Sequence, residues 1–242
     1  MINMAMVMAA GLGTRMRPLT NDRPKPLVTL AGKALIDHSL DKLREAGIGR
    51  VIVNVHYLPD MVIDHLAGHA RDLDIHISDE RDVLLETGGG LIKALPMLTE
   101  EPFYCINSDN VWTENGGNSL LDLAAHWDAA KMDALLLVVP NARAFNHSGA
   151  GDFFMDDGGL LARRGDNSSA PFIYTGIQLI SHRLLRDPPV GPFSTNILWS
   201  RAIEEGRLFG MEHKGEWFDI GSPEAIAPTE ARLAKSDLIL NG

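Results

Sequence analysis

The sequence predicts an α/β protein with a Rossmann-like, doubly wound and mainly parallel (mixed) sheet, to which antiparallel strands are added in the C-terminal half. Short apolar runs alternate with segments of helical period through the first half, a glycine-rich turn follows the first run, and a run of Asp and Gly at residues 156–159 marks a later tight turn. A chain of 242 residues has the length of one large α/β domain. We therefore expect residues 1–242 to form a single domain.

The first half is expected to alternate strands and helices. Residues 34–46 carry apolar side chains at helical spacing and are followed by Gly47, which favours a helix end. A proline at position 59 is typical of a first helical turn. The expected strands are residues 4–8, 51–55, 75–77, 103–106 and 134–139, and the expected helices are residues 34–46, 59–66, 90–98 and 119–131.

The second half is less regular. The turn at residues 156–159 is expected to join two antiparallel strands. A further strand is expected at residues 172–180, and helices at residues 194–205 and 223–235. We find no repeat, low-complexity tract or clear linker in the chain.

Composition and charge exclude several classes of protein. With 22 Lys and Arg against 32 Asp and Glu, the net charge is −10, which disfavours a general nucleic-acid partner. The single cysteine, Cys105, forms no intrachain disulfide and is expected in the core. The first 14 residues are uncharged but too few for a membrane span, and they lack the basic start of a signal peptide. We therefore expect a cytoplasmic protein without a membrane partner; the sequence does not indicate its oligomeric state.

The strongest local signal is the glycine-rich loop directly after the first strand. Gly11 and Gly13 let backbone N–H groups approach an anion closely, at the edge of a parallel sheet where ligands commonly bind. Arg15 and Lys25 place two cations beside this loop, and prolines on both sides of Lys25 stiffen its segment. Residues 1–36 carry a net charge of +4, which leaves −14 for the rest of the chain. We infer a binding site for a small polyanion.

Two common phosphate-binding motifs are absent from this loop. The dinucleotide fingerprint requires glycine where the chain has Met16, and the P-loop spacing is missing. A nicotinamide-dependent dehydrogenase is therefore disfavoured.

Two aspartates are candidate magnesium ligands. Asp109 follows the strand expected at residues 103–106, so it lies at the ligand-binding edge of the sheet. Asp219 lies between Phe218 and Ile220, which indicates a strand end rather than a solvated face. Carboxylates suit Mg²⁺, which also takes oxygens of substrate phosphates.

The string AAGLGTRMRPLT followed by PKPL resembles the signature of sugar-1-phosphate nucleotidylyltransferases. The resemblance implies the nucleotide-diphospho-sugar transferase type of fold, Mg²⁺ as cofactor, and a nucleoside triphosphate and a sugar 1-phosphate as substrates. It also implies the following roles: catalysis by Arg15 and Lys25; nucleotide binding by Gly11, Gly13, Thr14, Arg15, Lys25, Thr87 and Gly88; sugar-phosphate binding by Asn107, Asp152 and Asp219; and metal binding by Asp109 and Asp219.

Four further motifs narrow the resemblance. ETGGG at residues 86–90, N-x-D with VWT just beyond it, GDF at 151–153 and WFDIGS at 217–222 are similar to the N-acetylmuramate 1-phosphate uridylyltransferases of cell-wall recycling. This implies transfer of UMP from UTP to N-acetylmuramate 1-phosphate, with ETGGG reading the base. The chain departs from the pattern at Ser108, where glycine is frequent, and at Asn110, which is one extra residue beside Asp109.

Alternative functions stay open at this stage. Mannose-1-phosphate guanylyltransferase and glucose-1-phosphate uridylyl- or thymidylyltransferase use the same chemistry, and a non-catalytic nucleotide-sugar sensor would keep the fold. His65 and His69 have a spacing that zinc ligands use, but no third ligand is evident in the sequence. We interpret the methionines and tryptophans as core residues, with Trp112 close enough to Asp109 to line a pocket.

Overall fold

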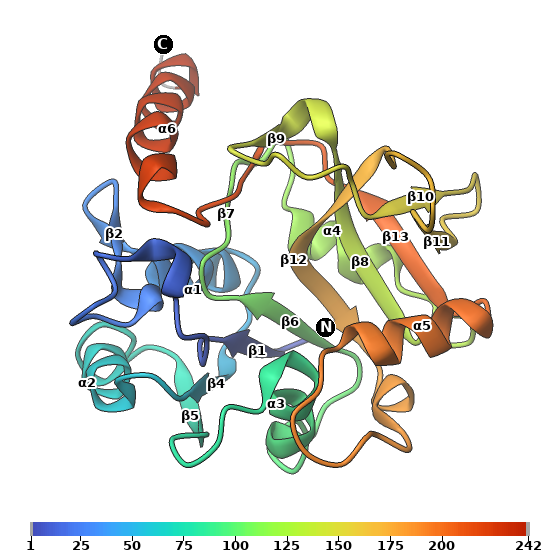
Figure 1. Ribbon diagram of the computed structural model, residues 1–242, viewed down its shortest axis with the longest axis horizontal. Helices are drawn as coiled ribbons and strands as arrows, with labels where there is room; N and C mark the ends of the chain where they lie inside the picture. The colour runs from blue at the N-terminus through green and yellow to red at the C-terminus, as the bar shows by residue number, and fades with distance from the viewer. Residues whose placement is uncertain (1, 241–242) are drawn as a thin grey trace.

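The computed structural model describes residues 2–240, with side chains placed through residue 235, so residues 1, 241 and 242 of the expected single domain lie outside it. A twisted central sheet has the strand order β13-β8-β12-β6-β1-β4-β5 (Figure 1). Strand β12 runs antiparallel to β6 and β8, and the other neighbours are parallel. The predicted mixed, mainly parallel sheet is confirmed.

The bounds of the elements are as follows. The strands are β1 (Met4–Met8), β2 (Thr29–Leu30), β3 (Lys33–Ala34), β4 (Arg50–Val55), β5 (Asp74–Asp79), β6 (Phe103–Asn107), β7 (Val111–Trp112), β8 (Ala134–Pro140), β9 (Ala144–Phe145), β10 (Phe153–Met155), β11 (Leu161–Arg163), β12 (Phe172–Ile180), β13 (Leu208–Glu212) and β14 (Trp217–Phe218). The α-helices are α1 (Leu35–Glu45), α2 (Pro59–His69), α3 (Glu86–Ala94), α4 (Ser119–His126), α5 (Asn196–Glu204) and α6 (Ile226–Leu240). Short 3₁₀ helices are η1 (Thr14–Met16), η2 (Lys25–Leu27), η3 (Asn141–Arg143), η4 (His182–Leu185) and η5 (Pro223–Ala225).

Helices cover both faces of the central sheet, as doubly wound topology requires. Alternation along β1 divides the core, because Ala5 and Val7 pack with α1, α2 and α4 while Met4 and Met6 pack with α3 and α5. Strand β1 is therefore buried on both sides and reads as a continuous apolar run. Among the described residues, no helix combines the length and apolarity needed to cross a membrane.

A second, three-stranded sheet joins segments far apart in the sequence, in the order β7-β14-β9. Its strands have two residues each, and Phe218 of β14 lies opposite Val111 of β7 and Phe145 of β9. Phe218 and Val111 enter a separate apolar cluster with Met16 and Leu30 from the segment that follows the glycine loop. This cluster fixes the small sheet beside the loop.

Most expected elements are confirmed within a few residues, and the turn at residues 156–159 does join the antiparallel strands β10 and β11. Two helix predictions were wrong in extent. The helix expected to start at residue 90 begins at Glu86, so the glycine run lies inside it. The helix expected to reach residue 131 ends at His126, because the Asp128 side chain accepts from the backbone N–H of Ala130 and starts a turn instead.

Candidate active site

A cleft of about 410 Å³ opens at the carboxyl ends of β1, β4 and β6. Its wall includes Gly11, Lys25, Asn54, Thr87 and Asp109. A smaller hollow of about 210 Å³ adjoins it, and the two share Met8, Thr87, Asn107 and Ser194. The switch in strand direction between β6 and β12 lies beneath this second hollow, since Tyr174 and Gln178 of β12 line it.

The glycine loop has a fixed shape. Gly13 has φ +63°, a left-handed conformation that favours glycine, and a β-carbon there would lie 2.9 Å from Cβ of Lys25. The buried Thr20 hydroxyl donates to the Gly13 carbonyl at 2.8 Å. Gly11 has open space above it, while Thr14 and Arg15 are exposed and begin η1. Gly11 therefore lines the cleft on a loop whose shape is fixed at Gly13, while Gly13, Thr14 and Arg15 are not among the lining residues of either hollow.

Lys25 and Asp109 form an ion pair in the wall of the cleft. The ammonium group of Lys25 contacts Oδ2 of Asp109, and the two side chains are 14% and 31% exposed. Lys25 begins η2, whereas Asp109 follows β6 after Ser108, whose N–H donates to the Met8 carbonyl at 3.0 Å. In the described part of the chain, no ion pair is formed by the other cations of the loop segment, Arg15, Arg17 and Arg23.

The small sheet brings Asp219 toward Asp109. Because β14 and β7 are antiparallel and Phe218 lies opposite Val111, the chain leaves β14 at Asp219 on the same side of the sheet from which it enters β7 after Asp109. Asn110 is 4% exposed and ties the junction together: its amide donates to the Gly176 carbonyl at 2.9 Å and accepts from the Trp217 indole at 3.3 Å. The extra residue at this position is thus a buried bridge from β6 to β12 and β14.

Asp219 has partners that the sequence did not indicate. His147 Nδ1 lies 3.3 Å from Asp219 Oδ2, and the Asp219 N–H donates to the Phe145 carbonyl at 3.0 Å. A β-carbon at Gly221 would lie 2.9 Å from Asp219 Oδ1 and 3.1 Å from Nη1 of Arg15. Asp219 and Arg15 therefore lie beside the same glycine, so the glycine loop and the small sheet meet there.

The three glycines at 88–90 allow close packing. A β-carbon on Gly88 would collide with the Phe193 ring, and one on Gly89 would lie 3.0 Å from the Gly191 carbonyl oxygen. The Gly88 N–H already donates to the Phe193 carbonyl at 2.8 Å, while Thr87 stands in the cleft and accepts from the Thr195 N–H at 2.9 Å. The run thus lets α3 approach the loop before α5.

A buried polar chain supports the cleft from behind. The Asn54 side chain accepts from the Ala9 N–H at 2.8 Å and donates to Glu80 Oε1 at 2.7 Å. Burial raises the pKa of the Glu80 carboxyl. A β-carbon on Gly90 would lie 2.9 Å from both side chains. Asn54 is a polar residue inside the apolar run 51–55, and that interruption is the signal that could have marked it.

The remaining expected site residues fall into two groups. Asn107 and Ser108 line the cleft, with the Asn107 amide packed against Gly176, where a β-carbon would lie 2.7 Å from it. Asp152 is not among the lining residues of either hollow, and its carboxylate accepts from the Tyr174 N–H at 2.9 Å. Asp152 therefore touches the backbone of a residue that lines the second hollow.

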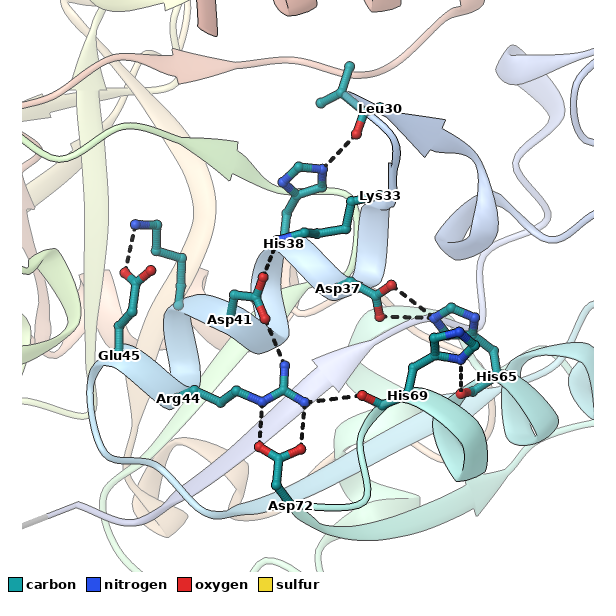
Figure 2. A network of polar contacts seen from close by, with 11 residues as sticks. Leu30, Lys33, Asp37, His38, Asp41, Arg44, Glu45, His65, His69 and Asp72 are labelled. Carbon is teal, nitrogen blue, oxygen red and sulfur yellow. Dashed lines mark hydrogen bonds and ion pairs between the residues drawn. The ribbon is translucent and has the colours of Figure 1, made fainter. Parts of the chain in front are cut away.

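The residues set aside from the sequence also have defined places. His65 stacks on His69 with ring centroids 4.2 Å apart, and its Nε2 lies 2.9 Å from Asp37 of α1 (Figure 2). Cys105 lines the second hollow but is nearly buried, which raises the pKa of its thiol to about 12. Trp112 is buried, and its indole donates to Glu114 at 2.7 Å.

Comparison with known proteins gives a consistent set of relatives. The family described as "Nucleotidyl transferase" matches residues 4–147. The chain is 45% identical to N-acetylmuramate alpha-1-phosphate uridylyltransferase of Caulobacter vibrioides, over 96% of this chain and 97% of the relative. It is 32% identical to the enzyme of the same name from Neisseria meningitidis, over 90% and 93%.

Solved structures share the fold. The inositol-1-phosphate CTP transferase from T. maritima superposes with a TM-score of 0.78 at 17% identity, over 97% of this chain and 96% of that one. The UDP-glucose pyrophosphorylase from Acinetobacter baumanii gives 0.76 at 16% identity, over 100% and 99%. The expected nucleotide-diphospho-sugar transferase type of fold is confirmed.

Proposed function

This chain belongs to the nucleotidyl transferase family and is a sugar-1-phosphate nucleotidyltransferase, and from that membership we propose that it makes UDP-N-acetylmuramate. It transfers the UMP group of UTP to the phosphate of N-acetylmuramate 1-phosphate and releases pyrophosphate, as a step of peptidoglycan recycling. The observation that carries the chemistry is the Lys25–Asp109 pair, in the cleft wall that the glycine loop also lines. The choice of substrates follows the names of the two most similar relatives reported above. Because UTP is the donor, we expect the reaction to occur in the cytoplasm.

The reaction is an in-line displacement at phosphorus. An oxygen of the sugar phosphate bonds to the α-phosphorus of UTP while the bond from that phosphorus to the bridging oxygen breaks, and pyrophosphate leaves with the electron pair. The attacking phosphate is already anionic, so no protein base has to remove a proton. Catalysis then consists of positioning the two phosphates and stabilising negative charge.

The residues of the glycine loop supply that stabilisation. Backbone N–H groups around Gly11 and Gly13 cradle the triphosphate. The ammonium of Lys25 and the guanidinium of Arg15 stabilise charge on the triphosphate and on the departing pyrophosphate. Thr87, which lines both hollows, and Gly88 are assigned to the nucleotide side, on the helix α3 that packs against this wall.

Asp109 and Asp219 fit the divalent metal ion that nucleotidyltransferases generally use. Both are partly exposed carboxylates beside the small sheet, Asp109 shortly before β7 and Asp219 directly after β14, and Mg²⁺ is typically held by one or two carboxylates together with substrate phosphates. Within residues 2–235, no group of three or more His, Cys, Asp or Glu side chains is arranged to hold an ion by itself. When bound, Mg²⁺ would neutralise charge on the reacting phosphates.

The acceptor is assigned to the second hollow. Asn107 lies on the boundary between the two hollows, which suits a residue that contacts the phosphate shared by acceptor and product. Asp219 is assigned to the same phosphate and would hold the metal ion beside it. Asp152 remains assigned to the sugar side, where its bond to the Tyr174 N–H holds one wall.

A pyrophosphate-release screen tests the proposed function. Purified protein with Mg²⁺ is offered UTP, GTP, CTP, ATP and dTTP, each with N-acetylmuramate 1-phosphate, N-acetylglucosamine 1-phosphate, glucose 1-phosphate and mannose 1-phosphate. We expect the highest kcat/KM for UTP with N-acetylmuramate 1-phosphate, and no release without an acceptor. Highest activity with another pair overturns the substrate assignment but not the chemistry.

The screen also separates the alternatives. The mannose-1-phosphate guanylyltransferase catalytic subunit beta of Xenopus tropicalis is 29% identical, and this chain spans 61% of its length. Release of pyrophosphate from GTP and mannose 1-phosphate would favour that activity. Tight binding of a nucleotide sugar without turnover of any substrate pair would indicate a sensor. A dehydrogenase would be supported only if NAD raised the melting temperature of the protein.

A further inference from the structure

We propose that His147 is a positioning residue: its imidazole fixes the Asp219 carboxylate so that the other carboxylate oxygen faces the divalent metal. This inference rests on the proposed function, because it assumes that Asp219 binds a metal. His147 lies outside the glycine loop and outside the ETGGG, N-x-D, GDF and WFDIGS motifs. The assignment follows from its contacts.

The geometry divides the two oxygens of Asp219 between different neighbours. Oδ2 lies 3.3 Å from His147 Nδ1, and Oδ1 lies beside Gly221 and Arg15. A carboxylate oxygen accepts hydrogen bonds, so Nδ1 of His147 is the donor in this contact. The imidazole thus hydrogen-bonds to Oδ2 and leaves Oδ1 for a ligand.

The imidazole is itself held by its surroundings. His147 is only 20% exposed, and its ring lies 5.9 Å from the Trp217 ring. A β-carbon at Gly149 would collide with His147 Nε2, so glycine at this position leaves room for the imidazole. Contacts with Trp217 and with Gly149 thus restrict the orientation of the ring.

A strained turn aims His147 at Asp219. Asn146 has φ +60°, a left-handed conformation that costs energy for residues other than glycine, although Asn tolerates it better than most. Its amide donates to the Thr229 hydroxyl at 2.9 Å in the first turn of α6. Helix α6 therefore locks the turn at the end of β9, and the turn directs the imidazole toward β14.

Such a contact changes metal binding because a metal-binding carboxylate must be held in one orientation. Partners that hydrogen-bond to metal ligands typically contribute about 10–100-fold in affinity or activity. Asp109 is oriented by Lys25, whereas Asp219 has His147 in the corresponding place. The two carboxylates are thus each fixed by a donor from a different segment.

The test measures Mn²⁺ binding by the loss of its free electron paramagnetic resonance signal, with no nucleotide or sugar present. We expect His147→Ala to raise the Kd for Mn²⁺ about 10–100-fold. His147→Asn places an amide N–H near the position of Nδ1 and should restore binding to near the wild-type value, whereas His147→Gln should not. Gly149→Ala, which displaces the imidazole without removing it, should give an intermediate Kd.

Matched controls exclude a general effect on folding. His126→Ala removes an exposed histidine of α4, and Gly68→Ala adds a β-carbon where nothing lies within 4 Å; both should leave the Kd unchanged. In the uridylyltransferase assay, His147→Ala should require more Mg²⁺ for half-maximal rate and recover most of its kcat at saturating Mg²⁺. A merely structural role would lower the melting temperature and kcat without moving the metal dependence.

The outcomes distinguish the two proposals. An unchanged Kd in His147→Ala, or no Mn²⁺ binding by the wild type, overturns the role of His147. If the wild type binds Mn²⁺ and His147→Ala weakens it, but no substrate pair yields pyrophosphate, the positioning role stands and the proposed function fails. Recovery by Gln rather than Asn would place the functional nitrogen at Nε2 and also contradict the proposal.

Discussion

Two lysine–aspartate ion pairs show how differently the same interaction is used in this molecule. Lys25 and Asp109 pair in the wall of the cleft, and Lys33 and Asp41 pair at the edge of α1. Figure 2 shows the second pair within a dense network in which Asp41 also contacts Arg44, and Arg44 contacts Asp72. The cleft pair has fewer neighbours but lies where a ligand would sit.

The number of polar contacts therefore does not mark a functional site. In the network of Figure 2, the charges satisfy one another on a largely exposed surface, where ion pairs contribute little to stability. In the cleft, Lys25 lies in a segment with three further cations that have no carboxylate partner in the described structure. Positive charge in excess of its partners is what a triphosphate requires.

The largest expected effect comes from removing the cleft lysine. Lys25→Met should lower kcat about 10²–10³-fold, because one electrostatic donor to the reacting phosphates is lost. Lys33→Met removes the matching lysine of the α1 pair and should leave kcat within about twofold, as for other exposed ion pairs. Steady-state rates of pyrophosphate release check both. Equal losses in the two variants would break the distinction between the pairs.

A second pair of variants compares a tightly packed glycine of α3, behind the cleft, with an open glycine of α2, the helix that carries His65 and His69 of Figure 2. Gly90→Ala in α3 should gain helix propensity of about 0.5–1 kcal/mol. It should nevertheless lose about 1–3 kcal/mol of unfolding free energy by overpacking, since the added β-carbon meets Asn54 and Glu80 at 2.9 Å. Gly68→Ala in α2 has open space and should not destabilise. Urea unfolding measures the unfolding free energy of both variants. An unchanged value for Gly90→Ala would mean that the hydrogen-bonded residues Ala9, Asn54 and Glu80 are not tightly packed against α3.

The smallest expected effect is on the pH dependence of stability. Burial lowers the pKa of His213, beside the small sheet, and of His38, in the network of Figure 2, below the ordinary value of 6.5. Each is neutral when folded and takes up a proton when unfolded, so its contribution is present above pH 6.5 and lost as pH falls toward the folded pKa. His213→Gln and His38→Gln should each reduce the loss of stability between pH 7.5 and 5.5. Unfolding curves at pH 7.5 and pH 5.5 measure this difference in unfolding free energy. If both variants lose as much stability as the wild type, burial of the two histidines does not cause the loss.

The central sheet was predictable because its strands are long and apolar enough to show their period. Asp109 was placed correctly at the edge because it follows such a strand. The small sheet was not predicted, since strands of two residues carry no period, and its pairing joins positions 73 and 107 residues apart along the chain (Ala144 with Trp217, Val111 with Phe218). A short range of sequence cannot indicate such a contact.

The glycines at residues 88–90 and His147 show two further reasons why the sequence did not predict the structure. Gly88, Gly89 and Gly90 indicate a loop by propensity, but tertiary packing against Phe193 and Asn54 makes them helical. His147 gave no signal, because its partner Asp219 is 72 residues away and its turn depends on Thr229 of α6. The positions of Asp109 and Asp219 at strand ends were therefore accessible to sequence reasoning, and the contact of Asp219 with His147 across the small sheet was not.

The pairing of β14 with β7 and β9 has a consequence for synthesis of the protein. A nascent chain emerges N-terminal end first, so Lys25 and Asp109 are available well before Asp219, which follows strand β14. Closing the long loop between β7 and β14 adds an entropic cost to this late step. Asp219 thus comes together with Lys25 and Asp109 only after β14 has been made, so a growing chain on the ribosome carries the glycine loop before the small sheet can form.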